Sequence, residues 1–472
     1  MTLKSINPYT NEVIEEFEEI SEKQVEDKIQ KSAEAFDEWK RTTFEYRKKL
    51  MLEVADLLKE GSAKLGETIT KEMGKPISES KAEAEKCAWV CEHYANDAEV
   101  LLHREAVAAD THMSYVTYEP QGTILGVMPW NFPLWQVFRF LAPTLMAGNV
   151  ALLKHASNVQ LCAKAIESTL EKAGVPEGVF QNLRIGSDKV KKVIEHPAVK
   201  AVTLTGSEGA GSSVAEIAGA NIKKTVLELG GSNSFIVLDD ADIDKAAEIG
   251  AKARLQNGGQ SCIAAKRFIL HKNIADEFLQ KFQEQMAQYT IGDPMQEQTK
   301  LGSLSSVDQA NKVKEQVEKS VEQGAEIVFG DYPDEAKYPA TLVTKVKPGM
   351  PLFDEEVFGP VAAVIIAEDE EEAIKLSNNS RFGLGVSLFT NNLKKAQELI
   401  PEFEDGAVFV NELVKSDPRL PFGGTKKSGY GRELAVNGIR EFVNVKTVYI
   451  DKLHESEQDV DETKISMGTP DQ

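Results

Sequence analysis

The sequence predicts an α/β fold with two mainly parallel, doubly wound sheets. Apolar runs of strand length alternate with amphipathic runs of helical length from residue 122 onward, which is typical of such sheets. The alternation is seen over 122–229 and again over 235–410. Two α/β units in sequence indicate two domains with a cleft between them, where ligands commonly bind.

Composition and charge exclude several other classes of protein. The 472 residues are enough for two or three domains, and 42% hydrophobic with 27% charged residues suits a soluble globular chain. A net charge of −21 argues against nonspecific nucleic-acid binding and against an anionic membrane surface. No apolar run reaches about 18 residues, so no membrane span is expected. Four cysteines do not make a disulfide scaffold, and the N-terminus has no signal-peptide core, so we expect a reducing cytoplasm.

The first hundred residues read as helical. Ser21 and Gln24 form a capping-box pattern before the first apolar stripe. Further helices are expected over 44–60, which ends at a glycine, and over 78–102; their charges are interpreted as solvated faces. The extended stretch 113–118 is expected to be an edge strand or a subunit contact.

The two alternating regions set out the expected strands and helices in order. The first region has strands at 123–127, 150–153, 201–205 and 224–227, with helices at 134–147, 159–172 and 207–218. The second has strands at 234–238, 266–271, 361–366, 384–389 and 407–410, with helices at 242–256, 274–288, 307–323, 370–378 and 392–400. The polar, acidic tail from about residue 451 has little periodicity, and its last part is expected to be disordered.

A candidate nucleophile, Cys262, ends the glycine-rich polar stretch 256–262. Glycines let the backbone approach a ligand, and exposed N–H groups can stabilise an anion that forms beside the sulfur. The alternative is a small buried hydrophobe, which suits Cys87, Cys91 and Cys162 in their alanine-rich helical patterns. The polar setting of Cys262 is poor core material and favours a reactive thiol.

Two further positions suggest a site for an anionic ligand. Residues 206–211, between a strand and a helix, do not follow the usual G-x-G-x-x-G pattern, but a helix N-terminus there can bind phosphate. An ordinary connection between a strand and a helix is the alternative. Lys154 ends a strand, at the sheet edge where ligands are expected; the alternative is a solvated lysine.

Seven clusters, in this order and spacing, resemble the NAD(P)-dependent aldehyde dehydrogenase superfamily. They are MPWNFP at 128–133, KHAS at 154–157, TGSEG at 205–209, ELGG at 228–231, QNGGQSC at 256–262, EEVFGP at 355–360 and PFGG at 421–424. The resemblance covers nearly the whole chain except the last twenty or so residues.

The resemblance implies a domain organisation. A Rossmann-type cofactor domain would comprise 1–112 and 122–229, and an α/β catalytic domain 230–429. An oligomerisation arm with the C-terminal segment would comprise 113–121 and 430–455, before a flexible tail at 456–472. The arm implies a homodimer or homotetramer.

The resemblance also implies a mechanism around Cys262. Its thiolate would attack an aldehyde, while the Asn131 amide and the Cys262 backbone N–H stabilise the thiohemiacetal oxyanion. Hydride transfer to the nicotinamide would leave a thioester, which Glu228 would hydrolyse as general base. From the residues alone, Glu228 could be a surface carboxylate and Asn131 a turn former. Glu228 also argues against the coenzyme-A-dependent relatives, which lack that base.

The cofactor residues are likewise carried over from the resemblance. They are Trp130, Lys154, Ser157, Gly206, Ser207, Leu229, Glu356 and Phe358. Many NAD-preferring members have a glutamate at the position of Ser157, where it would repel a 2′-phosphate. A serine would not, and Lys154 could pair with the phosphate, so we expect NADP to be preferred over NAD. No metal is expected.

The expected substrate is a small aldehyde that carries a carboxylate. Arg139 lies eight residues past Asn131, about two helical turns along, among aromatic residues. A buried arginine suggests a bound anion, with a structural salt bridge as the alternative. The stretches 135–140, 154–157 and 415–419 resemble bacterial succinate-semialdehyde dehydrogenases, in which an arginine at the position of Arg139 grips the substrate carboxylate.

Three alternative functions stay open at this point. The first is oxidation of another short aldehyde. The second is a thiol hydrolase that uses Cys262 with a histidine base, although none of the 7 histidines lies near Cys262 in sequence. The third is a non-catalytic binding protein on the same scaffold.

Overall fold

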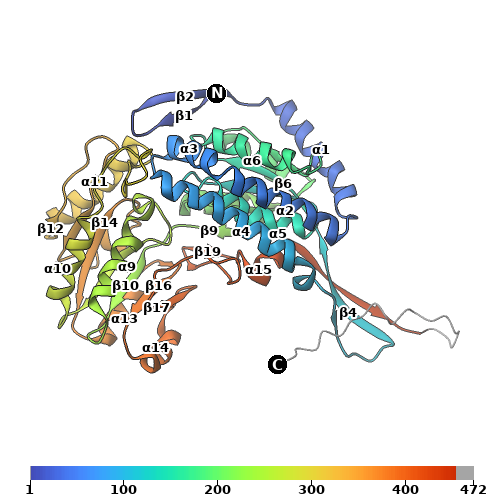
Figure 1. Cartoon of the computed structure of the whole chain (residues 1–472). Helices are drawn as coiled ribbons and strands as arrows, with labels where there is room; N and C mark the ends of the chain where they lie inside the picture. Colours follow the sequence, from blue (N-terminus) through green and yellow to red (C-terminus); the bar gives the residue numbers. More distant parts are fainter. Residues whose placement is uncertain (1, 453–472) are drawn as a thin grey trace.

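The computed structural model describes residues 2–452, and two sheets dominate it (Figure 1). The predicted disordered tail at 456–472 lies outside the described residues. No helix among residues 2–452 is long and apolar enough to cross a membrane. The domain boundaries expected from the sequence stay a prediction.

A six-stranded sheet is built from the first alternating region. Its order is β19-β9-β8-β5-β6-β7, and every pairing is parallel except that of β19 with β9. The strands are β5 (Thr123–Met128), β6 (Val150–His155), β7 (Phe180–Asn182), β8 (Val199–Thr205), β9 (Lys224–Glu228) and β19 (Gly429–Tyr430). Because β5, β6, β8 and β9 are parallel, their carboxyl ends lie along one edge of the sheet.

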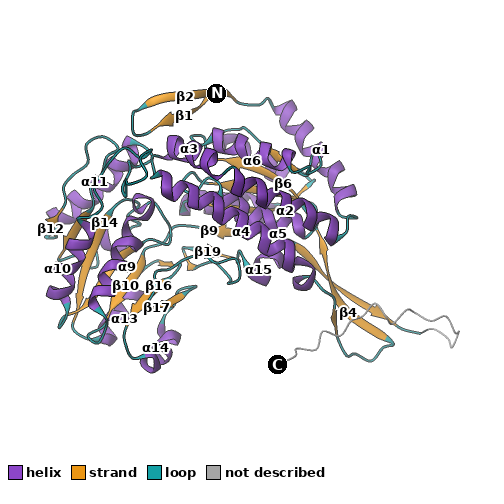
Figure 2. Ribbon diagram, in the orientation of Figure 1, coloured by secondary structure: helices purple, strands orange, loops and turns teal. Residues whose placement is uncertain are grey.

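Helices cover both faces of this sheet, as Figure 2 shows. One apolar core joins it to α2 (Phe44–Glu60), α3 (Ser62–Met73), α4 (Ile77–Leu101), α5 (Trp135–Met146) and α6 (Gln160–Lys172). On the opposite face a second core includes α1 (Glu22–Trp39), α7 (Val190–Glu195) and α8 (Glu208–Ala220). Leu153 of β6 packs in the first core and its neighbour Leu152 in the second, as expected for a strand buried on both faces.

A seven-stranded sheet forms the other half of the molecule. Its order is β12-β13-β14-β11-β10-β16-β17, and only β12 is antiparallel to its neighbour. The strands are β10 (Asn233–Val237), β11 (Ala265–His271), β12 (Glu326–Phe329), β13 (Thr341–Thr344), β14 (Val361–Ala367), β16 (Val386–Phe389) and β17 (Val408–Val410). The helices are α9 (Ile243–Leu255), α10 (Ala275–Met286), α11 (Val307–Glu322), α12 (Pro351–Asp354), α13 (Glu370–Asn378) and α14 (Leu393–Leu399).

The expected strands and helices of both regions are found within a few residues, and the structure adds further short elements, among them β7 and α7 in the first region and β12, β13 and α12 in the second. The strands β12 and β13 were not predicted from the sequence. Both are only four residues long, and β12 alternates between exposed and half-buried positions, so neither gives a strong apolar run. A two-stranded pair, β15 (Phe382–Gly383) with β18 (Thr425–Lys426), and the short turns η1 (Ser187–Lys189), η2 (Gln256–Gly259) and η3 (Ile400–Glu402) complete this inventory.

The N-terminal residues differ from the helical prediction. They form an antiparallel hairpin of β1 (Thr2–Asn7) and β2 (Glu12–Glu18) that lies over α3 (Figure 1). Pro8 and the positive φ of Asn11, 60°, make the turn, and the glutamate-rich second strand is nearly all exposed. The helix begins after it, at Glu22, and the capping box of Ser21 and Gln24 is confirmed, with both reciprocal hydrogen bonds.

A third sheet projects from the body as an arm (Figure 1). It has the order β20-β4-β3, from β3 (Glu105–Ala106), β4 (Met113–Pro120) and β20 (Val443–Ile450), and α15 (Ala435–Arg440) leads into it. The predicted strand at 113–118 is therefore present, paired antiparallel with β20 along its whole length. Association of copies through this arm stays a prediction.

Candidate active site

The loop that carries Cys262 is held in a conformation that needs its particular residues. Asn257 and Gly258 have φ of 54° and 59° in η2, and Gly259 has φ of 73°, values that asparagine and glycine tolerate best. The Asn257 amide donates to the carbonyl of Asn131 at 2.7 Å, and the buried Arg254 donates to the carbonyl of Gly259 at 2.7 Å. These hydrogen bonds fix the loop against the end of β5.

A buried lysine lies behind the nucleophile. Lys266, on β11, donates to the carbonyls of Ser261 and Cys262, both at 2.8 Å, and lies 3.4 Å from a carboxylate oxygen of Glu356. Burial lowers the pKa of this ammonium to about 8, against the opposing effect of Glu356. Lys266 therefore orients the Cys262 backbone and places a positive charge near the thiol.

The thiol of Cys262 is half-buried, whereas Cys87, Cys91 and Cys162 are fully buried in the core. Burial raises the pKa of Cys262 to about 11; the positive charges of Arg139 and Lys266 oppose the rise. The polar setting in the sequence favoured a reactive thiol. The structure differs, because burial of the half-exposed residue favours the protonated form of the thiol at neutral pH.

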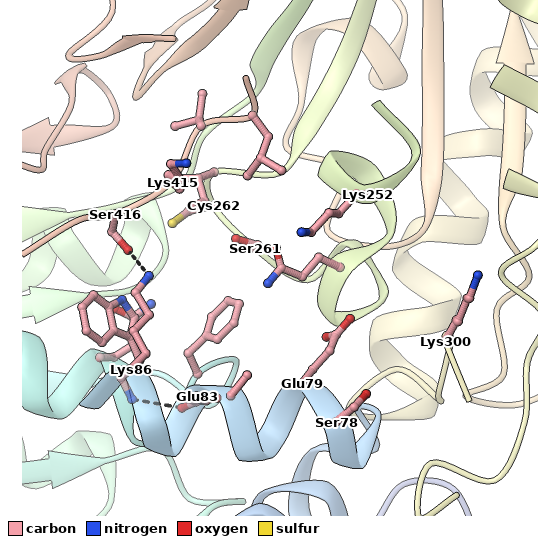
Figure 3. A pocket seen from close by; sticks show the side chains of 18 of the residues that line it. Ser78, Glu79, Glu83, Lys86, Lys252, Ser261, Cys262, Lys300, Lys415 and Ser416 are labelled. Atoms are coloured by element: carbon pink, nitrogen blue, oxygen red, sulfur yellow. Dashed lines mark hydrogen bonds between the residues drawn. The ribbon is translucent and has the colours of Figure 1, made fainter. Parts of the chain in front are cut away.

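Cys262 lies where two cavities meet. The larger, about 780 Å³, has aromatic walls from Phe132, Trp135 and Phe422, and Figure 3 shows Cys262 at its side. The smaller, about 210 Å³, contains Asn131 and many of the expected cofactor residues. Among the described residues, Cys262 and Gln136 line both cavities. A ligand in each cavity could therefore reach the same sulfur.

Asn131 lines a cavity that Cys262 also lines, and its catalytic role stays a prediction. It follows β5, is 4% exposed, and its amide nitrogen donates to the carbonyl of Gln260 at 3.0 Å. It lines the smaller cavity together with Cys262. An amide donor therefore lies in the cavity into which the thiol opens.

Glu228, the last residue of β9, lies deeper. It is 1% exposed, and neither carboxylate oxygen has a hydrogen-bond partner among the described residues. Burial raises the pKa of Glu228 well above its ordinary range, and the charge of Glu433 adds to the rise. Glu228 lines neither of the two cavities that meet at Cys262. Burying a carboxyl group without a hydrogen-bond partner costs free energy. Such an arrangement is therefore unusual for a residue with a purely structural role.

The expected cofactor residues gather at the carboxyl edge of the six-stranded sheet. The smaller cavity is lined by Trp130, Gly206, Ser207, Leu229, Glu356 and Phe358. The rings of Trp130 and Phe358 meet edge to face with centroids 5.6 Å apart. Ser207 is the N-cap of α8 and accepts from the Ala210 N–H at 3.3 Å. A further cavity of about 430 Å³ contains Lys154 and Ser157. All eight predicted residues thus line two cavities, and Glu356 and Phe358 reach the smaller one from the segment between α12 and β14.

These cavities fit a dinucleotide in two observed respects. Lys154 forms no ion pair among the described residues, and burial lowers the pKa of its ammonium. The N-terminus of α8 faces a cavity lined by glycines, where backbone N–H groups can meet phosphate. Glu356, for its part, accepts from the Gly231 N–H at 3.0 Å and is therefore held in place.

Arg139 forms a buried ion pair with Glu433. It is 1% exposed on α5, pairs through Nε with Glu433, and donates from Nη2 to the Thr205 hydroxyl at 3.1 Å. Its guanidinium lies over the ring of Phe422, 4.7 Å from the centroid. The salt bridge weighed as the alternative is therefore present. Arg139 also lines the larger cavity, and a role in substrate binding stays a prediction.

Sequence reasoning missed Glu433 and Lys86. Glu433 is placed by a backbone bridge to Phe422, and burial raises the pKa of its carboxyl. Lys86 lies on α4 and lines the larger cavity. Lys86 lies seven residues after Glu79 and three residues after Glu83, a spacing that places all three on one helix face. That spacing was the signal available in the sequence.

Comparisons with known proteins find one family and close relatives. Residues 1–448 match the aldehyde dehydrogenase family. A probable NADP(+) succinate-semialdehyde dehydrogenase of Synechocystis is 47% identical over 95% of this chain and 100% of the relative. An NADP(+) succinate-semialdehyde dehydrogenase of Mycobacterium avium is 46% identical over 95% of this chain and 97% of the relative. The crystal structure of a Streptococcus pyogenes succinic semialdehyde dehydrogenase with NADP+ superposes with a TM-score of 0.93, at 37% identity, over 95% of this chain and 100% of that one.

Proposed function

This chain belongs to the aldehyde dehydrogenase family, and from that premise we propose that it oxidises succinic semialdehyde to succinate with NADP as the preferred cofactor. The observation that carries the proposal is the position of Cys262 between a cavity with cationic side chains and a cavity with the expected cofactor residues. The names of the relatives at 45–47% identity support the same substrate and cofactor.

Cys262 begins the reaction. The thiol gives its proton to a water molecule, the sulfur then attacks the aldehyde carbon, and the electron pair of the carbonyl π bond moves onto the oxygen, which becomes an oxyanion. The Asn131 amide and the Cys262 backbone N–H donate to that oxygen. Because burial raises the pKa of Cys262 to about 11, the thiolate must be stabilised within the site, and Arg139 and Lys266 supply positive charge for this.

Release of the product falls to Glu228. The thiohemiacetal carbon loses a hydride, and the oxidised nicotinamide, when bound, would accept it. The carbon is left as a thioester on Cys262. Glu228 removes a proton from a water molecule, the oxygen attacks the thioester, and the carboxylic acid leaves as the C–S bond breaks. Burial raises the pKa of Glu228, so its carboxyl must lose its proton before it acts as the base, and neither of its oxygens has a hydrogen-bond partner among the described residues.

Cofactor choice is tested at Ser157. Replacing Ser157 with Glu should lower the ratio of kcat/KM with NADP to kcat/KM with NAD by about 100-fold or more, because the new carboxylate would repel a 2′-phosphate. The matched control is Ser157→Gln, which has the same size without the charge and should keep NADP as the better cofactor. Steady-state kinetics with both cofactors measures the ratio. Equal effects of Glu and Gln would show that charge at this position does not set the preference.

The substrate is tested by comparing two aldehydes of similar size. We expect kcat/KM for succinic semialdehyde to exceed that for pentanal by about 10- to 100-fold, the range of one or two charge-assisted hydrogen bonds. Both substrates are measured with NADP in excess, and the reaction without cofactor serves as the blank, in which no carboxylic acid should form. A preference for pentanal, or none, would assign the enzyme to another short aldehyde.

A further inference from the structure

Lys86 is a cation inside the larger cavity, with no role assigned so far. It projects from α4, and its ammonium donates to the Ser416 hydroxyl at 2.8 Å and lies 4.2 Å from the centre of the Trp135 ring. Figure 3 shows Lys86, Ser416 and Cys262 around the same hollow. Two neutral groups, a hydroxyl and an aromatic ring, therefore hold the ammonium beside the nucleophile.

No carboxylate neutralises this ammonium in the described part of the chain. The carboxylates whose charges act on Lys86 are Glu83 and Asp417. Glu83 is already paired with the buried Lys75 and accepts two backbone N–H groups at the start of α5. Asp417 is paired with Arg419 at 2.7 Å. Both acids are therefore engaged elsewhere, and Lys86 keeps a net positive charge in a partly buried place.

Arg139 offers less free charge to the same cavity. Its Nε faces Glu433 and its Nη2 donates to Thr205, so a carboxylate already balances its charge. A ligand carboxylate that approached Arg139 would also approach Glu433. Beside Lys86, it would meet an ammonium without a counter-ion and the hydroxyl of Ser416. The balance of charge favours an anion near Lys86.

We propose that Lys86, oriented by Ser416, binds the carboxylate of the substrate and is a specificity-determining residue of this enzyme. The inference rests on the proposed function, because it assigns the anionic group of that substrate to a place in the cavity. The ammonium and the Ser416 hydroxyl each donate to the carboxylate, while the aldehyde end reaches Cys262. The Trp135 ring packs against the Lys86 ammonium and shields one side of the ammonium–carboxylate pair from water.

The test compares two aldehydes on matched variants. Lys86→Gln should lower the ratio of kcat/KM for succinic semialdehyde to that for pentanal by about 10- to 100-fold, chiefly through KM. Lys86→Arg, which keeps the charge, should hold the ratio within about threefold of the wild type. Lys71→Gln is the control, because Lys71 lies on the neighbouring helix α3, pairs with Glu67, and neither residue lines the cavity. Ser416→Ala should lower the ratio by about three- to tenfold and serves as a second variant if Lys86→Gln does not fold.

The pH profile gives an independent readout. Burial, and next the charge of Arg139, lower the pKa of Lys86 to about 8, while Glu83, Cys87 and Asp417 act in the opposite direction. Below that pH Lys86 is charged and binds the carboxylate; above it the charge is lost. The wild-type ratio should therefore fall as pH rises through about 8, and the fall should vanish in Lys86→Arg. Effects of pH on the chemistry itself cancel, because both aldehydes use the same nucleophile.

Each outcome decides between the two proposals. An unchanged ratio in Lys86→Gln and Ser416→Ala, in a wild-type enzyme that prefers succinic semialdehyde, would overturn the assignment of Lys86 and leave the proposed function intact. Equal losses on both aldehydes would overturn it as well. A wild-type enzyme without preference for the carboxylate-bearing aldehyde would overturn the proposed function, and the role of Lys86 with it.

Discussion

Replacing Cys262 with alanine should lower kcat by about 10⁵-fold or more, which corresponds to about 7 kcal/mol of activation free energy. The reason is that the covalent route needs a sulfur, and the alanine methyl group offers no nucleophile at the point where the two cavities meet. Cofactor binding should persist, because the residues at the carboxyl edge of the six-stranded sheet are untouched. Steady-state kinetics and a fluorescence titration with NADPH measure the two properties.

The matched control for this change is Cys91→Ala. Cys91 is fully buried on α4 and lines neither of these cavities, so the variant should keep kcat within about twofold while its unfolding temperature falls slightly. A Cys262→Ala enzyme that retained more than about one per cent of wild-type kcat would show that the sulfur is not the nucleophile. Loss of NADPH binding in the same variant would point to a disrupted fold instead.

Replacing Glu228 with glutamine should separate hydride transfer from hydrolysis. We expect a burst of NADPH close to one equivalent per active site, followed by steady turnover about 10²- to 10⁴-fold slower than in the wild type. The amide cannot accept a proton from water, so the thioester accumulates on Cys262. Stopped-flow absorbance of NADPH measures both phases.

A chemical rescue provides the control for this second variant. Hydroxylamine attacks thioesters without a general base, so it should speed turnover in Glu228→Gln and have no effect in Cys262→Ala. A Glu228→Gln enzyme without a burst would mean that Glu228 acts before hydride transfer. Its oxygens, which have no partner in the described structure, would then need another explanation.

The arrangement of the site at one sheet edge could be predicted from the sequence. Apolar runs of strand length locate β6 and β8, and parallel pairing brings their carboxyl ends to the same edge, where Lys154 and Gly206 each line a cavity. Cys262 could likewise be identified from its immediate neighbours, because the glycine-rich stretch 256–262 ends at it. The hairpin of β1 and β2 could not be predicted, because its glutamate-rich second strand is made of good helix formers.

The electrostatics of the site depend on contacts that no local pattern contains. The pKa of Cys262 rises because distant elements bury it, and its opposing charges come from α5 and β11. Lys86 belongs to a helix whose charges appeared solvated in sequence. Its hydroxyl partner, Ser416, is 330 residues further along the chain. The Arg139–Glu433 pair likewise joins residues that lie far apart in the sequence. Such pairs follow from the tertiary fold.

The central claim is that one sulfur carries the substrate as a thioester. The most direct measurement is intact-protein and peptide mass spectrometry of the Glu228→Gln variant after mixing with succinic semialdehyde and NADP. We predict a mass increase of one succinyl group per chain, on the peptide that contains Cys262, in proportion to the NADPH formed. NADPH formation without that adduct, or an adduct on another residue, would contradict the account.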